Sequence, residues 1–315
     1  MARVFTYIIS PLPMANGLIE SNETVCIKEI MMKKIIFISG CLCLLLTLLA
    51  PAAFGQSTIS AVRRTARKEL GQLNIEYNRD AFVKQASEGD TIAVELFLDA
   101  GMQLEGYDKN GQTVLIAAAA NGQVETVQLL LDRGANIDAL NSVNGSQHSA
   151  LYTAVRENRF DVVKLLLSRG VDVKKGVNIY ALQAAAARGS TDVAQVLLSK
   201  GADVNVMAYE ETPLQAAVRR QHVDMVKLLL NNKAEVNAQD REGYTALHMA
   251  TWGINPNIEI IKTLLDNGAD VNLKNKHGQT ALQLVPGERR FEPESAEDKR
   301  RSEIVDLLTK AGVKP

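Results

Sequence analysis

The chain has 315 residues, of which 46% are hydrophobic and 23% charged, with a formal net charge of -1. This is the composition of a globular protein with enough chain to bury a substantial core. Because a protein that neutralises nucleic-acid phosphates carries a basic face, the near-neutral charge argues against a nucleic-acid partner.

Residues 32–55 have the composition of a secretory signal peptide. Two lysines precede an unbroken, mostly apolar run over 35–50, and small residues around Ala53 and Gly55 suit a cleavage site. Cleavage after Gly55 would place everything from Gln56 outside the cytoplasm, which predicts a bacterial protein that is periplasmic or secreted. The alternative is an uncleaved membrane anchor, although the apolar run is short for a bilayer span. We interpret residues 1–31 as an extension upstream of the true start site.

The cysteines all lie upstream of the predicted cleavage site, at Cys26, Cys41 and Cys43. The mature chain therefore has no disulfide, no thiol nucleophile and no cysteine metal ligand. Residues 38–41, ISGC, are similar to a bacterial lipidation motif. Lipidation of Cys41 would leave CLCLLLTLLA as the mature N-terminus, which is unsuited to a polar tether, so we disfavour it.

From residue 80 onward one unit recurs along the chain. Its first leucine falls at successive spacings of 36, 31, 32, 33 and 35 residues, at Leu115, Leu151, Leu182, Leu214, Leu247 and Leu282. A degenerate copy precedes these units over 80–105, and the last copy has its two halves pushed apart. A fixed unit with variable joints indicates a repeat architecture.

Each unit predicts two short helices and an extended polar connector. Thr113, Thr212, Thr245 and Thr280 stand where a helix needs an N-cap, and Pro213 follows at a first helical position. Gly122 marks the end of the first helix after about two turns. The second helix carries apolar residues on one face and ends at a glycine such as Gly134.

These units resemble ankyrin repeats. The family pattern G-x-T-P-L-H-x-A-A-x-x-G-H-x-x-V-V-x-L-L-L-x-x-G-A-D-V-N is matched nearly whole by EGYTALHMA…EIIKTLLDNGADVN and by ETPLQAAVRRQHVDMVKLLLNNKAEVN. The resemblance implies an all-α repeat solenoid of stacked antiparallel helix pairs with β-hairpin-like fingers. It covers 80–315, in units of about 80–110, 111–144, 145–178, 179–208, 209–241, 242–276 and 277–315.

Both ends of such a stack need a polar cover. Residues 56–79 are expected to form a lead and cap, with Leu70, Leu73, Ile75 and Tyr77 in a short helix and turn packed on the first unit. At the other end Thr309 replaces a leucine, and Asp306, Lys310 and Lys314 are expected to face water. Those three polar side chains would close the stack.

The mature chain lacks the usual catalytic signatures: G-x-S-x-G, G-x-G-x-x-G, G-x-x-x-x-G-K-[ST] and H-E-x-x-H do not occur. His248 falls at the T-x-L-H position, where we expect it to hydrogen-bond the finger backbone, and Glu210 with Glu211 would form a solvated acidic edge. Asp203 and Asp270 belong to turns. We therefore expect no enzyme, no cofactor and no metal, although an enzyme with an unrecognised site stays a third hypothesis.

Specificity on a repeat scaffold lies in the features that break the period. The finger between Asp138 and Leu151 is long, the next one is short, and two residues are added after Trp252, the chain's one tryptophan. Residues 286–301 form an insertion that we expect to be a mobile, solvated loop. Trp252 either anchors a partner on the concave side or packs beneath its inserted loop.

The sequence thus predicts a monomeric, non-catalytic protein-binding module with no membrane span after signal cleavage. Its protein partner would bind the concave face and the fingers. An inhibitor or immunity-type regulator that occludes an envelope or secreted enzyme is the alternative. The expected partner-binding residues are Trp252, Tyr180, Asn144, Gln147, His148, Tyr209, Glu210 and Tyr244.

Overall fold

A computed structural model describes residues 56–143, 145–252, 256–286 and 296–312. The chain divides into two compact units, Met1–Val62 and Arg63–Pro315, and the whole repeat lies in the second. The predicted signal peptide, the three cysteines, Asn144 and Lys314 fall outside the described residues. Within the described residues, no helix has both the length and the hydropathy needed to cross a membrane.

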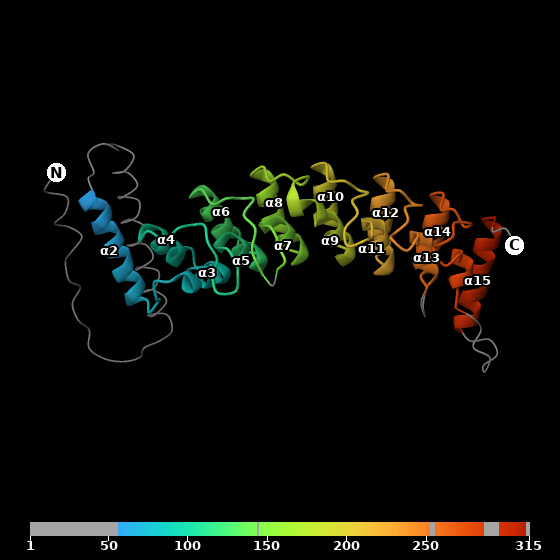
Figure 1. The fold of residues 1–315 in the computed structure, drawn as a ribbon, viewed down its shortest axis with the longest axis horizontal. Helices are drawn as coiled ribbons and strands as arrows, with labels where there is room; N and C mark the ends of the chain where they lie inside the picture. Colours follow the sequence, from blue (N-terminus) through green and yellow to red (C-terminus); the bar gives the residue numbers. More distant parts are fainter. Residues whose placement is uncertain (1–55, 144, 253–255, 287–295, 313–315) are drawn as a thin grey trace, which may run out of the picture. The chain divides into compact units, whose positions relative to one another are not determined.

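Six helix pairs follow one another along the second unit, each an inner helix and then an outer helix (Figure 1). The pairs are α3 (Arg79–Glu88) with α4 (Thr91–Asp99), α5 (Val114–Asn121) with α6 (Val124–Asp132), α7 (Ala150–Arg156) with α8 (Phe160–Ser168), α9 (Ala181–Arg188) with α10 (Thr191–Ser199), α11 (Pro213–Arg219) with α12 (Val223–Asn231), and α13 (Ala246–Thr251) with α14 (Ile258–Asp266). Each inner helix contacts the next inner helix, and each outer helix contacts the next outer helix. The predicted all-α repeat solenoid is confirmed.

Packing explains why the inner helices are built from small residues. Ala117, Ala118 and Ala119 of α5 are buried, because α5 contacts both α3 and α7. Leucines of the outer helices, such as Leu130 and Leu166, are also buried and fill the space between pairs. The predicted caps are present: the Thr113 hydroxyl accepts the Ile116 N–H, and Gly122 ends α5 in the left-handed conformation with φ 78°.

In the units of α11 and α13, one repeat position links the unit to the following finger. Gln215 accepts the Thr212 N–H at 2.8 Å through Oε1, and its Nε2 donates to the Tyr244 carbonyl of the following finger at 2.8 Å. His248 occupies the same position one unit later. Its Nδ1 accepts the Thr245 N–H, and its Nε2 lies 3.1 Å from the Gln279 carbonyl. The expected structural role of His248 is confirmed.

The N-terminal cap differs in part from the prediction. Helix α2 (Gln56–Gln72) has 17 residues and is not short, and Leu70 on it is buried. Tyr77 stacks on Phe97 with ring centroids 5.7 Å apart. The expectation for Leu73 is wrong: its side chain is 42% exposed, because α2 ends at Gln72 and the chain turns at Asn74, with φ 60°.

At the C-terminal end the inner helix is reduced to the 3-10 helix η3 (Ala281–Leu284), and the outer helix is α15 (Ala296–Lys310). The expectation of a loop over 286–301 is therefore wrong for its last six residues, which are helical, while 287–295 lie outside the described residues. Asp306 and Lys310 are exposed and paired at 2.6 Å, and Thr309 is exposed, as a polar cap requires.

Candidate functional site

The finger before α11 holds its tip in an unusual backbone conformation. Ala208 and Glu211 exchange two backbone hydrogen bonds of 3.0 Å, and the two residues between them, Tyr209 and Glu210, have φ 52° and 69°. A two-residue turn with both φ values positive normally takes Asn and Gly. Non-glycine residues held there cost about 1–3 kcal/mol each and cluster at ligand-binding positions. The turn leaves the Tyr209 side chain 72% exposed.

The base of the same finger is fixed by a polar network around the buried Glu211 carboxylate. Arg219 donates to both carboxylate oxygens of Glu211, at 2.9 and 2.6 Å, and Gln183 Nε2 donates to Oε1 at 3.0 Å. The hydrogen bond with Glu211 raises the pKa of Arg219. The predicted solvated acidic edge is therefore wrong for Glu211, which is 9% exposed, because α9 and α11 both supply donors to it. Glu210 is exposed and pairs with Arg241 at 2.7 Å.

The next unit, that of α13, carries a pair of stacked aromatic side chains. Trp252 caps the C-terminus of α13 and stacks on Tyr244, with ring centroids 5.9 Å apart and an interplanar angle of 12°. Tyr244 in turn meets the His248 ring edge-on at 6.0 Å. Although it packs on Tyr244, the Trp252 side chain remains 65% exposed. Residues 253–255, the inserted loop, lie outside the described residues.

The aromatic side chains continue toward earlier units. The His148 ring stacks on Tyr152 at 5.1 Å, the hydroxyls of Tyr152 and Tyr209 are 3.4 Å apart, and Tyr180 lies 6.1 Å from Tyr209. Burial and the hydrogen bond with Tyr209 raise the pKa of Tyr152 to about 12. We name the set His148, Tyr152, Tyr180, Tyr209, Tyr244 and Trp252 the aromatic row.

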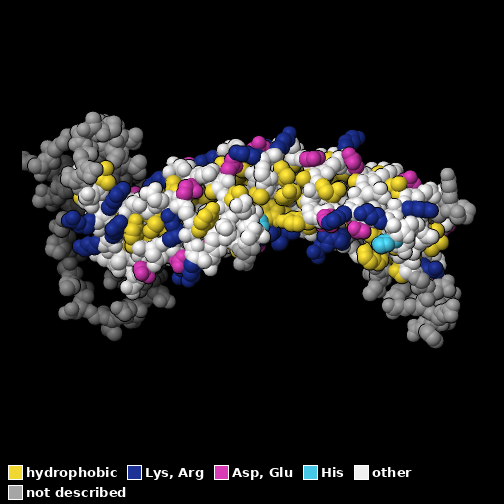
Figure 2. Space-filling model, viewed as in Figure 1, with side chains coloured by type: hydrophobic (Ala, Val, Ile, Leu, Met, Phe, Trp, Pro, Cys, Tyr) yellow, Lys and Arg dark blue, Asp and Glu magenta, His cyan; other side chains and the backbone are white. Residues whose placement is uncertain are grey.

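A cavity of about 400 Å³ opens between the last three members of this row, Tyr209, Tyr244 and Trp252. Its polar lining includes Glu210, Glu211, Arg219, Asp240 and Glu242, and its apolar lining includes Val218, Met249, Ala250 and Ile260. Among the described residues no group of three His, Cys, Asp or Glu side chains could hold a metal ion. Figure 2 shows hydrophobic side chains gathered over the middle of the repeat, with Lys and Arg side chains around them.

The structure thus brings six of the eight predicted residues to one surface: Trp252, Tyr180, His148, Tyr209, Glu210 and Tyr244. Gln147 is exposed in the finger before α7, and Asn144 lies outside the described residues. Sequence reasoning missed Tyr152 and Arg219. Alignment of the repeat units could have identified both. Tyr152 occupies the repeat position of Gln215 and His248, and Arg219 occupies that of Trp252.

His248 gives the repeat a dependence on pH. Burial lowers its pKa, which outweighs the raising effects of the Gln279 carbonyl and of Asp240. The folded chain therefore binds the proton less readily than the unfolded chain. Stability is fully present above the ordinary histidine pKa of about 6.5 and is lost as the pH falls below it. Protonation of Nδ1 would also oppose the Thr245 N–H that this atom accepts.

We expect His248→Gln to keep the stability at pH 7.5 within about 1 kcal/mol and to reduce the loss between pH 6.5 and 5. Gln215 shows that glutamine makes both links at this repeat position. Urea denaturation at several pH values measures the effect. Burial lowers the pKa of His148 as well, so some acid sensitivity should remain. An unchanged pH profile in the variant would refute this role of His248.

A family model of ankyrin repeats in three copies matches residues 52–141, 82–177, 138–208 and 181–275. Among solved structures, the chain is similar to the human ASB11 ankyrin repeat domain, with a TM-score of 0.60 and 25% identity over 74% of this chain and 98% of that one. The ankyrin repeat domain of Bcl-3, a member of the IkappaB protein family, gives a TM-score of 0.59 and 28% identity over 72% and 97%.

The relatives found by sequence match a smaller part of this chain than the solved structures do. "Ankyrin repeat, SAM and basic leucine zipper domain-containing protein 1" of Ovis aries is 35% identical over 119 residues, 36% of this chain and 24% of that protein. The Dasypus novemcinctus protein of the same name is 35% identical over 137 residues, 39% and 28%. The chain thus spans about a quarter of the length of these relatives. Both are mammalian proteins, which lends no support to a bacterial, exported type.

Proposed function

From the premise that the chain belongs to the ankyrin-repeat family, we propose that it is a non-catalytic module that binds a protein partner through the aromatic row. Ankyrin-repeat domains are generally protein–protein interaction modules. The partner would lie across the fingers and inner helices of the units from α7 to α13, where the aromatic row runs. The protein would act as a monomer that presents this face.

The exposure of Tyr209 and Trp252 carries the proposal. They are 72% and 65% exposed, on neighbouring units beside one cavity. Large aromatic side chains dominate the energetics of protein interfaces when they enter fitted pockets. The two backbone hydrogen bonds between Ala208 and Glu211 and the Glu211 network hold this finger in one conformation, so a partner meets a surface that is already ordered.

The absence of a catalytic role is part of the proposal. Two of the four carboxylates around the cavity are held in structural pairs, Glu211 with Arg219 and Glu210 with Arg241. The described cavity lining contains no serine, cysteine, histidine or lysine that could act as a nucleophile beside a base. The surface is therefore better suited to recognition than to bond-breaking chemistry.

We further propose that the domain acts outside the cytoplasm of a bacterium. Support comes from the sequence of residues 32–55 alone, with its basic start, apolar run and small-residue end. N-terminal sequencing of the protein from an exported fraction should begin at Gln56. A mature N-terminus at Met1 or a protein confined to the cytoplasm would overturn this proposal and leave the binding proposal intact.

The binding proposal predicts that Trp252→Ala weakens the partner complex at least about 30-fold, equivalent to the loss of about 2 kcal/mol at an interface hot spot. Because Trp252 is exposed at the end of α13, the variant should keep its melting temperature within a few degrees. The partner is captured by cross-linking to the purified repeat, and its affinity is measured by calorimetry for the wild type and the variant.

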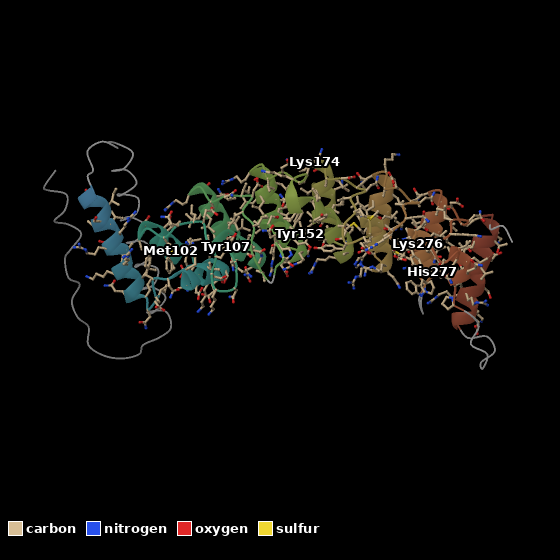
Figure 3. The ribbon with its side chains drawn as sticks, in the orientation of Figure 1. Met102, Tyr107, Tyr152, Lys174, Lys276 and His277 are labelled. Carbon is tan, nitrogen blue, oxygen red and sulfur yellow. The ribbon has the colours of Figure 1, made fainter. Side chains whose placement is uncertain are left out.

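Tyr107→Ala is the matched control, because Tyr107 (Figure 3) is an exposed tyrosine in the finger between α4 and α5, three units before the finger that carries Tyr209. It should leave the affinity unchanged. A partner that binds Trp252→Ala as tightly as the wild type refutes the proposed face. A partner that proves to be an enzyme and loses its activity in the complex would instead favour the inhibitor reading.

A further inference from the structure

We infer that the cavity between Tyr209, Tyr244 and Trp252 binds a cationic side chain, lysine or arginine, of the protein partner. The inference rests on the proposed function and adds the chemistry of the residue that is recognised. Three features of the cavity lead to it: aromatic walls, an excess of carboxylates and an apolar floor.

The aromatic walls offer π faces to an incoming cation. Tyr244 and Trp252 are nearly parallel, with 12° between their planes, and Tyr209 stands on the neighbouring finger as a further wall. A cation over the face of tryptophan or tyrosine is attracted by the negative charge of the ring face, and tryptophan is the best partner. The high exposure of Trp252 and Tyr209 means that these faces are accessible without a rearrangement of the core.

The charged lining is predominantly acidic. Glu210, Glu211, Asp240 and Glu242 supply four carboxylates, against the single guanidinium of Arg219. Glu211 is neutralised by Arg219, and Glu210 pairs with Arg241 outside the lining. Asp240 and Glu242 therefore carry the negative charge that a partner cation would meet.

Neither of these two carboxylates is saturated by the protein. Asp240 uses Oδ1 to accept the N–H groups of Glu242 and Tyr244, at 2.9 and 2.8 Å, and Oδ2 accepts no hydrogen bond from the residues that the structure describes. Glu242 meets Lys276 at 3.9 Å, close to the limit of an ion pair. Lys276 extends from the finger before η3 (Figure 3) and is 60% exposed, so a partner cation can compete with it for Glu242.

The apolar floor suits the aliphatic part of the same side chain. Val218, Met249, Ala250 and Ile260 form the apolar part of the lining, and Val218, Ala250 and Ile260 are buried. Lysine and arginine bury their methylene chains against such surfaces while the charged group keeps polar contacts. A volume of about 400 Å³ is at the small end of ligand pockets, which fits one extended side chain better than a large ligand.

Trp252 makes the occupancy of the cavity directly measurable, because it is the only tryptophan in the chain. The full chain is titrated with end-blocked pentapeptides that carry arginine, lysine, norleucine or glutamate between glycines. Arginine and lysine peptides should change the fluorescence of Trp252 saturably, and the effect should weaken with salt. Norleucine has the shape of the lysine stem without the charge, and neither it nor glutamate should bind. Methylguanidinium alone tests whether a free cation suffices without a peptide.

Two variants with opposite expected effects on affinity test the electrostatic contribution to peptide binding. Glu242→Gln should weaken the binding of the lysine peptide roughly two- to fivefold, as expected for the loss of an exposed ion pair. Lys276→Gln should strengthen binding of the lysine peptide, because one of the two cations near Glu242, Lys276 and Arg241, is removed. A merely damaged cavity could not produce tighter binding. Tyr107→Ala should bind like the wild type.

Equal binding of norleucine and lysine, or weaker binding by Lys276→Gln, overturns the inference. So does a lack of any fluorescence response to the cationic peptides. If the cationic peptides cause no fluorescence change while Trp252→Ala still weakens the partner complex, only the proposed specificity for a cation fails. If cationic peptides bind the cavity but the partner is indifferent to Trp252→Ala, the proposed function fails and the cation site remains.

Discussion

Gly111→Ala is expected to destabilise the protein by about 3 kcal/mol or more, because two independent penalties meet at this finger glycine. Gly111 has φ +77°, where an alanine is strained, and a Cβ there would lie 1.9 Å from the Ser142 carbonyl oxygen of the next finger. The backbone would have to move. That movement would also break the hydrogen bond in which the Ser142 N–H donates to the Gly111 carbonyl at 2.8 Å.

Two other finger glycines provide a graded control. Gly278 has φ +74° at the same repeat position, but nothing lies within 4 Å of a Cβ there, so Gly278→Ala should cost only the conformational penalty of about 1–2 kcal/mol. Gly243, whose Cβ would lie 3.1 Å from backbone atoms of Asn275 and Lys276, should fall between them. Urea denaturation followed by circular dichroism measures the loss of unfolding free energy in the three variants and so gives their order. A cost at Gly278 equal to that at Gly111 would show that contact between fingers is not the cause.

Leu182→Ala is expected to cost about 2–5 kcal/mol, the usual range for a fully buried leucine. Leu182 is 0% exposed on α9, which contacts both α7 and α11. In a repeat array the loss of one central interface also uncouples the units on either side of it. We therefore expect the unfolding transition of the variant to broaden or to split in two.

Leu73→Ala is the matched control for this change, since Leu73 is 42% exposed beyond the end of α2. It should change the free energy of unfolding by no more than about 0.5 kcal/mol. A cost comparable to that of Leu182→Ala would mean that Leu73 does pack on the first unit, as its place in the sequence suggests.

The difference between Leu70 and Leu73 shows where sequence reasoning stops being sufficient. Both are leucines in the predicted cap, and the pattern assigns both to the core. Leu70 is buried, but Leu73 follows the last residue of α2, where the backbone has left the helix and the side-chain periodicity no longer applies. The end of a helix depends on what it packs against, so periodicity alone does not place it.

Glu211 shows the same limit of sequence-based prediction at the candidate site. Next to Glu210, it looks like one of two solvated carboxylates, and nothing local distinguishes them. It is buried because Gln183, 28 residues earlier, and Arg219 both donate to it. The contact with Gln183 joins two units, so an analysis of one unit at a time does not contain it.

The sequence by itself determined the repeat unit, its caps and the stacking of small inner helices against leucine-rich outer helices. These features follow from spacing within one unit, and spacing is a local property. Only the tertiary structure decided that side chains from four fingers meet in one aromatic row. It also decided that Glu211 is buried, and that Tyr209, Tyr244 and Trp252 enclose a cavity beside Asp240 and Glu242. The physical reason is that the contacts of Tyr152 with Tyr209 and of Gln183 with Glu211 join different units, as does the cavity between Tyr209 and Tyr244. The variable joints between the units set the distance and direction across which these side chains meet.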